Sequence, residues 1–332
     1  MRLLVLQFLI GITSVLVFTV IALKLKIVDH PGKLKIHRKP VPYLGGVAIA
    51  LSVFVGCVIN QINLSGQFIL FSSIFLLLGL WDDIWNIKAR TRFLLEASFS
   101  LVLVLIGVKI PVFTPISIVF SWLLIMGAIN SVNWMDGMDG LLGGVTIIVS
   151  SGFWYIGNAI GHPWVPRFME IFMVSILGFL IFNFHPARIF LGDAGSYFIG
   201  FTLAYISIEL LKFKFSWSLF ATILAFLGVF ILDSTIAVMR RVRLKRHPFE
   251  GDRSHLYDQF HRATGRYWGT VLFMYGIALI GVFVGGGTFK LNTPYNFILW
   301  TFSVIISYGI LFMLGFVSER FVYRMKTVKE ME

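Results

Sequence analysis

Long apolar segments joined by short polar ones make up most of this 332-residue chain. Residues 3–23 contain no charged side chain, and about 20 apolar residues are enough for a helix to cross a bilayer. This segment is longer than the apolar core of a signal peptide, about 7 to 15 residues, so we expect it to be retained. Only 13% of the residues are charged and the mean hydropathy is +0.86, values typical of a membrane protein.

Hydropathy along the chain predicts eleven membrane spans, or ten if the two short segments 67–81 and 93–108 are not both spans. The predicted spans are residues 3–24, 44–62, 67–81, 93–108, 113–129, 140–157, 168–183, 196–211, 217–238, 268–285 and 296–316. No internal repeat and no soluble domain interrupts them. The sequence therefore predicts an all-α polytopic integral membrane protein in which residues 1–332 form a single transmembrane domain.

The basic residues divide unequally between the two sides of this predicted topology. With the N-terminus outside, six of the 28 Lys and Arg residues lie on the outer side: Arg2, Lys109, Arg167, Lys212, Lys214 and Lys290. An excess of Lys and Arg on cytoplasmic loops sets the orientation of membrane proteins. It also explains the net charge of +12 without nucleic acid as a partner. Cys57 is the only cysteine, which excludes an internal disulfide.

The aspartates are distributed even less evenly. All nine lie on or near the predicted inner side: Asp29, Asp82, Asp83, Asp136, Asp139, Asp193, Asp233, Asp252 and Asp258. Acidic residues contribute little to topology, so orientation does not account for this clustering. We therefore predict an active site at the cytoplasmic face.

The segment LGLWDDIWNIKARTRF places two aspartates, Asp82 and Asp83, at the inner end of a predicted span. Adjacent carboxylates repel each other unless a cation lies beside them. One interpretation is a metal or substrate site. The other is a structural role, in which the pair caps a helix or is neutralised by Lys88, Arg90 or Arg92.

The segment NSVNWMDGMDG repeats an oxygen-bearing side chain every three residues, at Asn130, Asn133, Asp136 and Asp139. At that spacing the four side chains are expected to line one side of a helix or a tight turn. Gly137 permits close approach of the backbone to a ligand. The alternative is an ordinary polar turn, for which Asn and Asp are common residues.

Three further polar segments carry candidate binding groups. In FNFHPARIFLGDAGSYFIGF, Asp193 precedes a span, and the free N–H groups of a helix N-terminus suit phosphate, with helix capping as the alternative. The basic loop RRVRLKRHPFEGDRSHLYDQFHRATGR contains Asp252, Arg253 and His255, whose mixed charge favours a site, whereas its first arginines are typical of an anchor to anionic lipid. His37, in a basic segment, is a candidate phosphate contact.

The candidate groups share one chemical character. They supply carboxylate and amide oxygens and basic side chains, with few soft ligands, which suits Mg²⁺ or Mn²⁺ better than zinc. Mg²⁺ typically binds one or two carboxylates together with substrate phosphates, and phosphoryl transfer requires positioning and charge neutralisation. Because this chemistry lies at a membrane face, we predict that one substrate is a lipid phosphate.

The order of the motifs resembles that of the polyprenyl-phosphate N-acetylhexosamine-1-phosphate transferases, a superfamily that includes phospho-N-acetylmuramoyl-pentapeptide transferase. The resemblance covers about residues 29–266 and rests on the DD pair, NSVNWMDGMDGL, FNFHPARIFLGDAGS and DRSHL. It implies a catalytic transmembrane domain that transfers a sugar-1-phosphate, GlcNAc-1-phosphate in particular, from a UDP-N-acetylhexosamine to undecaprenyl phosphate and releases UMP. This is the first membrane step of cell-envelope polysaccharide synthesis.

The resemblance also implies partners, a location and a role for each matching residue. It implies Mg²⁺, with Mn²⁺ as a substitute, and a multi-pass protein of the bacterial plasma membrane with a cytoplasmic active site; whether it forms a homodimer stays open. The catalytic aspartates would be Asp82, Asp83 and Asp193, and the metal contacts Asp193, Asn133 and Asp83. The nucleotide would be held by Asn183, Phe190, Gly137, Asp139 and Asp136, with Phe190 stacking on uracil. Phosphate and sugar contacts would come from Arg92, His37, Asp252, Arg253 and His255.

Several alternatives stay open at this point. Leu256, Tyr257 and Asp258 follow His255, where the family's usual loop has further histidines; the muramoyl-pentapeptide branch has three, so a simple UDP-N-acetylhexosamine is favoured and that branch is the alternative. The lipid phosphate could attack directly or through an aspartyl-phosphate intermediate. An ion-coupled transporter is a different class, but transporters usually place their sites at the bilayer midplane and carry internal repeats.

Overall fold

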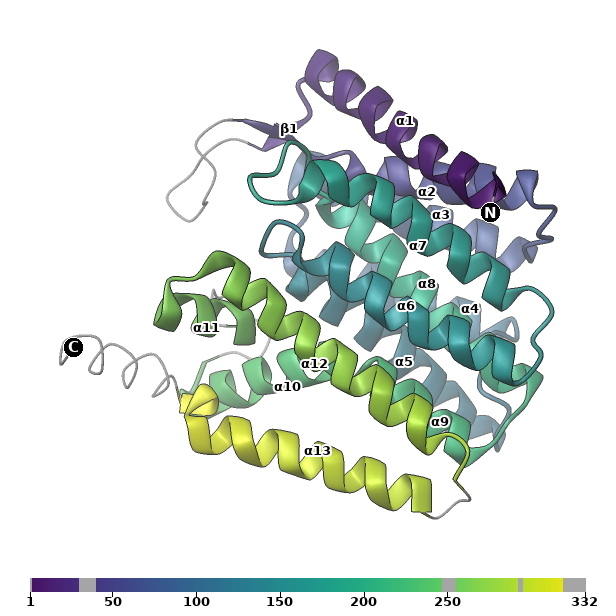
Figure 1. The fold of residues 1–332 in the computed structure, drawn as a ribbon, viewed down its shortest axis with the longest axis vertical. Coiled ribbons are helices and arrows are strands. Elements are labelled where there is room, and N and C mark those ends of the chain that lie inside the picture. Colours follow the sequence, from purple (N-terminus) through teal and green to yellow (C-terminus); the bar gives the residue numbers. More distant parts are fainter. Residues whose placement is uncertain (1, 30–39, 247–254, 292–294, 319–332) are drawn as a thin grey trace. The chain divides into compact units, whose positions relative to one another are not determined.

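The computed structural model describes residues 2–29, 40–246, 255–291 and 295–318, and the chain divides into two compact units, Met1–Phe215 and Ser216–Glu332. Each unit is described by itself, and the prediction of a single domain stays a prediction. The described residues are almost entirely helical (Figure 1). The helices of the first unit are α1 (Arg2–Leu25), α2 (Gly45–Ile59), α3 (Gly66–Trp85), α4 (Ala89–Leu105), α5 (Thr114–Met135), α6 (Leu141–Ala159), α7 (Val165–Asn183) and α8 (Gly192–Phe213).

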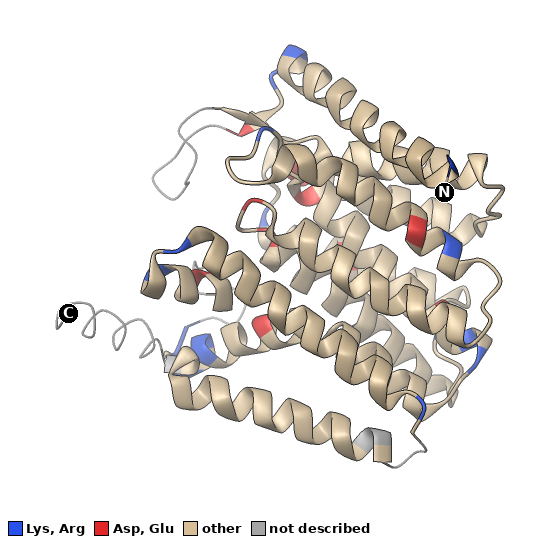
Figure 2. Cartoon of the chain, in the orientation of Figure 1, with Lys and Arg blue, Asp and Glu red and all other residues tan. Residues whose placement is uncertain are grey.

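The predicted all-α polytopic membrane fold is confirmed. Within the described residues, seven helices are long and apolar enough to cross a membrane, or eight if one bent pair counts as a single span. The prediction of ten or eleven spans exceeds this number because three of the predicted spans correspond to short helices. Helix α2 has 15 residues, α4 has 17, and the apolar helix Ile298–Leu314 is also shorter than the roughly 20 residues of a typical span. Charged residues lie mostly near helix ends, whereas the helix bodies carry few of them (Figure 2).

Helix α8 is the centre of the first unit. Nearly all of its residues are buried, and it packs against α2, α3 and α5. Two of these contacts require glycine, because a Cβ at Gly46 would lie 2.1 Å from the Cα of Gly195 and a Cβ at Gly79 would lie 2.4 Å from the carbonyl oxygen of Asp193. Small residues let membrane helices approach this closely. The close approach of α3 to the first turn of α8 sets the position of the polar residues described below.

A short hairpin connects α1 to α2 in the first unit. Strand β1 (Val28–Asp29) pairs antiparallel with β2 (Val41–Pro42), with Val28 opposite Pro42. The backbone of Phe190 donates to the carbonyl oxygen of Pro42 at 2.8 Å, and Gly45 donates to the carbonyl oxygen of Phe190 at 3.1 Å. The hairpin therefore anchors the segment 184–191, which leads into α8.

The second unit contains α9 (Trp217–Phe226), α10 (Gly228–Arg243), α11 (Leu256–Thr264), α12 (Tyr267–Thr288), α13 (Tyr295–Leu314) and the short 3-10 helix η1 (Phe316–Ser318). The predicted span over 217–238 consists of two helices, α9 and α10, which are bent by 68° at Leu227. The carboxylate of Asp233, fully buried in α10, accepts hydrogen bonds from the backbone of Leu256 at 2.7 Å and pairs with His255 at 2.8 Å. A buried carboxylate needs such partners, and these contacts join α10 to the start of α11.

Substitution of Gly79 by alanine tests the close packing of α3 on α8. We expect Gly79→Ala to destabilise the protein by about 1–3 kcal/mol, the usual cost of overpacking, because the new methyl group would displace α3 from the backbone of Asp193. The measurement is the midpoint of thermal unfolding in detergent. The matched control is Gly127→Ala in α5, where a Cβ meets nothing within 4 Å; equal midpoints for the two variants would contradict the packing described here.

Candidate active site

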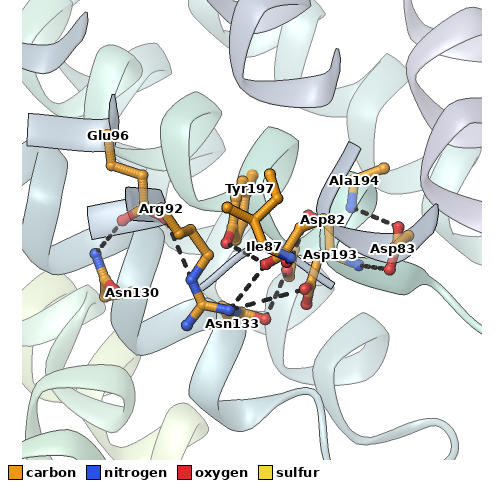
Figure 3. A network of polar contacts seen from close by, with 11 residues as sticks. Asp82, Asp83, Ile87, Arg92, Glu96, Asn130, Asn133, Asp193, Ala194 and Tyr197 are labelled. Atoms are coloured by element: carbon orange, nitrogen blue, oxygen red, sulfur yellow. Dashed lines mark hydrogen bonds and ion pairs between the residues drawn. The ribbon is translucent and has the colours of Figure 1, made fainter. Parts of the chain in front are cut away.

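The carboxylate of Asp83 caps the N-terminus of α8. Its Oδ1 accepts a hydrogen bond from the backbone N–H of Asp193 at 2.8 Å, and its Oδ2 accepts one from Ala194 at 3.1 Å (Figure 3). The first N–H groups of a helix lack partners within the helix and carry partial positive charge. Asp83, from the last turn of α3, therefore joins the two helices and fixes the position of Asp193.

The backbone before α8 is shaped to receive this carboxylate. Gly192 has a φ of +76°, a conformation that glycine adopts without steric cost, and a Cβ there would lie 2.6 Å from Oδ2 of Asp83. The hydroxyl of Tyr43 donates to the carbonyl oxygen of Asp83 at 3.0 Å. Burial, followed by the charges of Asp83 and Asp29, raises the pKa of the Tyr43 phenol, which keeps it protonated and able to donate.

This capping corrects one expectation for α8. The sequence predicted free N–H groups for phosphate at the helix start, but those of Asp193 and Ala194 are already bonded to Asp83. The alternative interpretation, in which an Asp or Ser of this segment is the N-cap, does not hold either, because the N-cap residue is Leu191 and its side chain makes no capping hydrogen bond. The capping aspartate is Asp83 from another helix, a pairing over 110 positions that local patterns do not indicate.

Asp82 is buried and makes a different set of contacts. Its Oδ1 accepts from the backbone N–H of Ile87 at 2.8 Å, which closes the turn after α3. Its Oδ2 pairs with Nη1 of Arg92 at 2.9 Å and accepts from the hydroxyl of Tyr197 at 3.4 Å. Of the three basic residues considered as partners of the DD pair, Arg92 is the one that pairs with Asp82.

Asp193 projects from the first turn of α8 into the same cluster. Its Oδ2 lies 4.0 Å from Nη1 of Arg92, so one guanidinium nitrogen faces the carboxylates of both Asp82 and Asp193 (Figure 3). The hydroxyl of Ser196 lies 3.0 Å from Oδ1 of Asn133 and 3.1 Å from the carbonyl oxygen of Asp193. Ser196 thereby holds Asn133 of α5 beside the start of α8.

The donor set fits a divalent cation. Asp82, Asp83 and Asp193 are carboxylates and Asn133 adds an amide oxygen, whereas Arg92 is the one basic side chain joined to these carboxylates by an ion pair within the described residues. Nowhere in those residues do three His, Cys, Asp or Glu side chains form a ready-made metal group. Mg²⁺ needs only one or two protein carboxylates when substrate phosphates complete its coordination. The excess negative charge is what such an ion would offset.

A second polar cluster links the turn after α5 to the segment after α7. Asn183 accepts from the backbone N–H of Gly140 at 2.9 Å and donates to the carbonyl oxygen of Ile189 at 2.9 Å. Oδ2 of Asp139 accepts from the backbone of Ala187 at 3.0 Å and lies 2.9 Å from Nδ1 of His185. Two of the predicted nucleotide contacts, Asn183 and Asp139, therefore hold two loop segments together.

The other predicted nucleotide contacts lie on or beside these loops. Phe190 is half-buried with its backbone bonded to the hairpin, and Asp136 and Gly137 are exposed in the turn. The expectation that Asn130, Asn133, Asp136 and Asp139 line one side is wrong, because α5 ends at Met135. Asn130 and Asn133 remain on the helix with different partners, Glu96 and Ser196, whereas the two aspartates lie in the turn.

The predicted sugar-binding residues are placed only in part. His37, Asp252 and Arg253 lie outside the described residues. His255 is in the second unit, where its ring is buried, with Nδ1 bonded to Asp233 at 2.8 Å and Nε2 3.4 Å from the guanidinium of Arg241. In this unit His255 supports the start of α11.

Three residues of the acidic cluster escaped the sequence analysis: Glu96, Ser196 and Tyr197. Glu96 is buried in α4 and accepts a hydrogen bond from Asn130 at 2.8 Å. The spacing of Arg92 and Glu96, four positions apart on a helix, is a signal that could have found it. Ser196 and Tyr197 lie in an apolar segment without a comparable signal.

Comparison with known proteins agrees with the resemblance stated from the motifs. Residues 65–211 match the family described as Glycosyl transferase family 4. The chain is 30% identical over 341 residues, 96% of this chain and 94% of the relative, to the Bacillus subtilis (strain 168) protein named "Probable undecaprenyl-phosphate N-acetylglucosaminyl 1-phosphate transferase".

Two further relatives carry closely similar names. The undecaprenyl-phosphate alpha-N-acetylglucosaminyl 1-phosphate transferase of Thermotoga maritima is 31% identical, with 81% of this chain and 84% of the relative covered. The protein of the same name from Escherichia coli (strain K12) is 26% identical, with 73% and 71% covered. The chain belongs to the polyprenyl-phosphate N-acetylhexosamine-1-phosphate transferase family.

Proposed function

We propose that the protein transfers GlcNAc-1-phosphate from UDP-GlcNAc to undecaprenyl phosphate and releases UMP. The names of its relatives support this donor sugar and this acceptor. The observation that carries the proposal is the cluster in which Arg92 pairs with Asp82 and faces Asp193, whose backbone N–H is bonded to Asp83, at the ends of α3, α4 and α8. Phosphoryl transfer uses carboxylates, which can hold a metal ion, together with a basic side chain such as that of Arg92, which can bind phosphate oxygens.

The reaction consists of one phosphoryl substitution. An oxygen of the lipid phosphate forms a bond to the sugar-linked phosphorus, the bond from that phosphorus to the bridging oxygen breaks, and UMP leaves with the bridging oxygen. A phosphate monoester has a second pKa of about 6, so at pH 7 the acceptor is mostly dianionic and needs no general base. Direct attack is therefore chemically sufficient.

The protein's own groups position the reacting phosphates. Arg92 offers a guanidinium to their oxygens, while Asp82 holds that guanidinium in place through the 2.9 Å ion pair. Asp193, Asn133 and the remaining lone pairs of Asp83 would hold Mg²⁺, or Mn²⁺ in its place, which supplies positive charge to the pyrophosphate when bound. The turn at Asp136 and Gly137 and the segment around Phe190 would receive the uridine.

The membrane location follows from the same reading. The protein is a multi-pass membrane protein, and we place it in the bacterial plasma membrane with the acidic cluster on the cytoplasmic side. The excess of Lys and Arg on the segments around the cluster supports this orientation. A cytoplasmic site gives access to a soluble UDP-sugar and to the phosphate head of a bilayer-embedded lipid.

Replacement of Asp193 tests the proposed function. We expect Asp193→Asn to lower kcat/KM by about 100-fold or more, as for loss of a group that stabilises transition-state charge. The measurement is UMP release by detergent-solubilised protein supplied with UDP-GlcNAc, undecaprenyl phosphate and Mg²⁺, with chelation and Mg²⁺ restoration as the test of metal dependence. The matched control is Glu209→Gln, a carboxylate further along α8 that pairs with Lys212 and should leave activity within about twofold. Full activity of Asp193→Asn would refute the metal role.

Isotope exchange separates direct attack from an aspartyl-phosphate intermediate. Both oxygens of Asp83 accept backbone N–H groups, and Oδ2 of Asp82 is paired with Arg92, so neither carboxylate is poised as a nucleophile. We expect no transfer of label from UMP into UDP-GlcNAc when the lipid acceptor is absent. The positive control contains the lipid-linked product, from which the reverse reaction incorporates label. Exchange without any lipid would overturn direct attack.

A further inference from the structure

A buried carboxylate next to the acidic cluster has no role in the reaction proposed above. Glu96, in α4, is 1% exposed. Its Oε2 accepts a hydrogen bond from Nδ2 of Asn130 at 2.8 Å, and its Oε1 lies 3.8 Å from Nε of Arg92. The hydroxyl of Tyr197 also interacts with this carboxylate. An ionisable group in such a place is costly and calls for a physical explanation.

Asn130 fixes the orientation of Glu96. Its side-chain amide donates to Oε2 of Glu96 and also to the carbonyl oxygen of Met126 at 3.0 Å, so both partners restrain the amide. The helices that carry the two residues are also joined by the Trp122 indole, which donates to the carbonyl oxygen of Ala97 at 3.0 Å. One oxygen of Glu96 is thus held by Asn130, while the other faces Arg92.

The contacts of Arg92 leave one face of its guanidinium available. Nε faces Glu96, and Nη1 faces Asp82 at 2.9 Å and Asp193 at 4.0 Å. Nη1 donates the hydrogen bond to Asp82, no such bond is found for Nη2 within the described residues, and the side chain is 24% exposed. A guanidinium is planar with its donors in a fixed fork, so contacts at Nε and Nη1 determine where Nη2 points (Figure 3).

We propose that Glu96 is a positioning residue that, held by Asn130, orients the guanidinium of Arg92 so that Nη2 is presented to a phosphate oxygen of the UDP-sugar. The inference rests on the proposed function, because it assumes that Arg92 meets the donor's phosphates. It adds a pair of residues, Glu96 and Asn130, that act through Arg92 and do not touch the substrate.

A double-mutant cycle between Glu96 and Arg92 tests this role. Glu96→Gln keeps the acceptor for Asn130 and the shape of the side chain but removes the charge that faces Nε. We expect it to raise the dissociation constant for UDP-GlcNAc and to lower kcat/KM, each by about 10- to 100-fold, the range seen when the support of a binding group is removed. In an Arg92→Lys background the same change should add less than about twofold, because residues that act as a unit are not additive.

Two controls keep the cycle interpretable. For each of the four proteins in the cycle, the dissociation constant for UDP-GlcNAc is measured by calorimetry in addition to kcat/KM. A variant without measurable activity therefore still contributes a binding constant. Ser100→Ala, one turn further along α4 at another buried polar position, should leave both quantities unchanged in either background.

The inference and the proposed function can fail separately. A wild-type protein that binds no UDP-GlcNAc and releases no UMP refutes the proposed function and the inference with it. An active wild type in which the effects of Glu96→Gln and Arg92→Lys multiply refutes the role of Glu96 alone, as does an unchanged Glu96→Gln variant.

Discussion

The bond between Asp83 and the first turn of α8 is the contact on which the candidate site depends. It brings the last turn of one buried helix to the first turn of another and uses both oxygens of the carboxylate. The contact requires that α3 and α8 approach without a side chain between them, which Gly79 provides. With α8 held in this way, Asp193 can lie opposite Arg92 and Ser196 can hold Asn133. The close packing of α3 on α8 therefore also determines where the polar groups of the candidate site lie.

The candidate site contains more carboxylates than basic groups to neutralise them, which is unfavourable for the stability of the folded protein. Asp82, Asp83, Asp193 and Glu96 lie in one contact network with Arg92. Buried charges of like sign are costly unless they are paired, and clusters of this kind are more typical of functional sites than of structural cores. This concentration of charge is consistent with the cation and the polyanionic substrate that we propose.

The class of fold and the main residues of the cluster could be predicted from the sequence. Long apolar segments, and aspartates at the ends of such segments, can both be recognised in short stretches of sequence. Other features depended on tertiary contacts. Glu96 lies within a segment predicted as an apolar span, and only its pairing with Arg92 and Asn130 distinguishes it. The bend at Leu227 and the contacts of Asp233 with residues more than 20 positions away leave no signal in the local sequence. The three-residue spacing from Asn130 to Asp139 predicted a common side, but the helix ends between them at Met135.

The capped start of α8 has a consequence for affinity. A helix terminus with unbonded N–H groups can attract an anion by itself, but here an internal carboxylate already occupies two of those groups. Under the proposed function, the diphosphate of the nucleotide would therefore be neutralised mainly by the co-bound ion and by the guanidinium of Arg92. By thermodynamic linkage, each of the two ligands would tighten the binding of the other. The apparent affinity for the nucleotide would therefore rise with the concentration of the free ion.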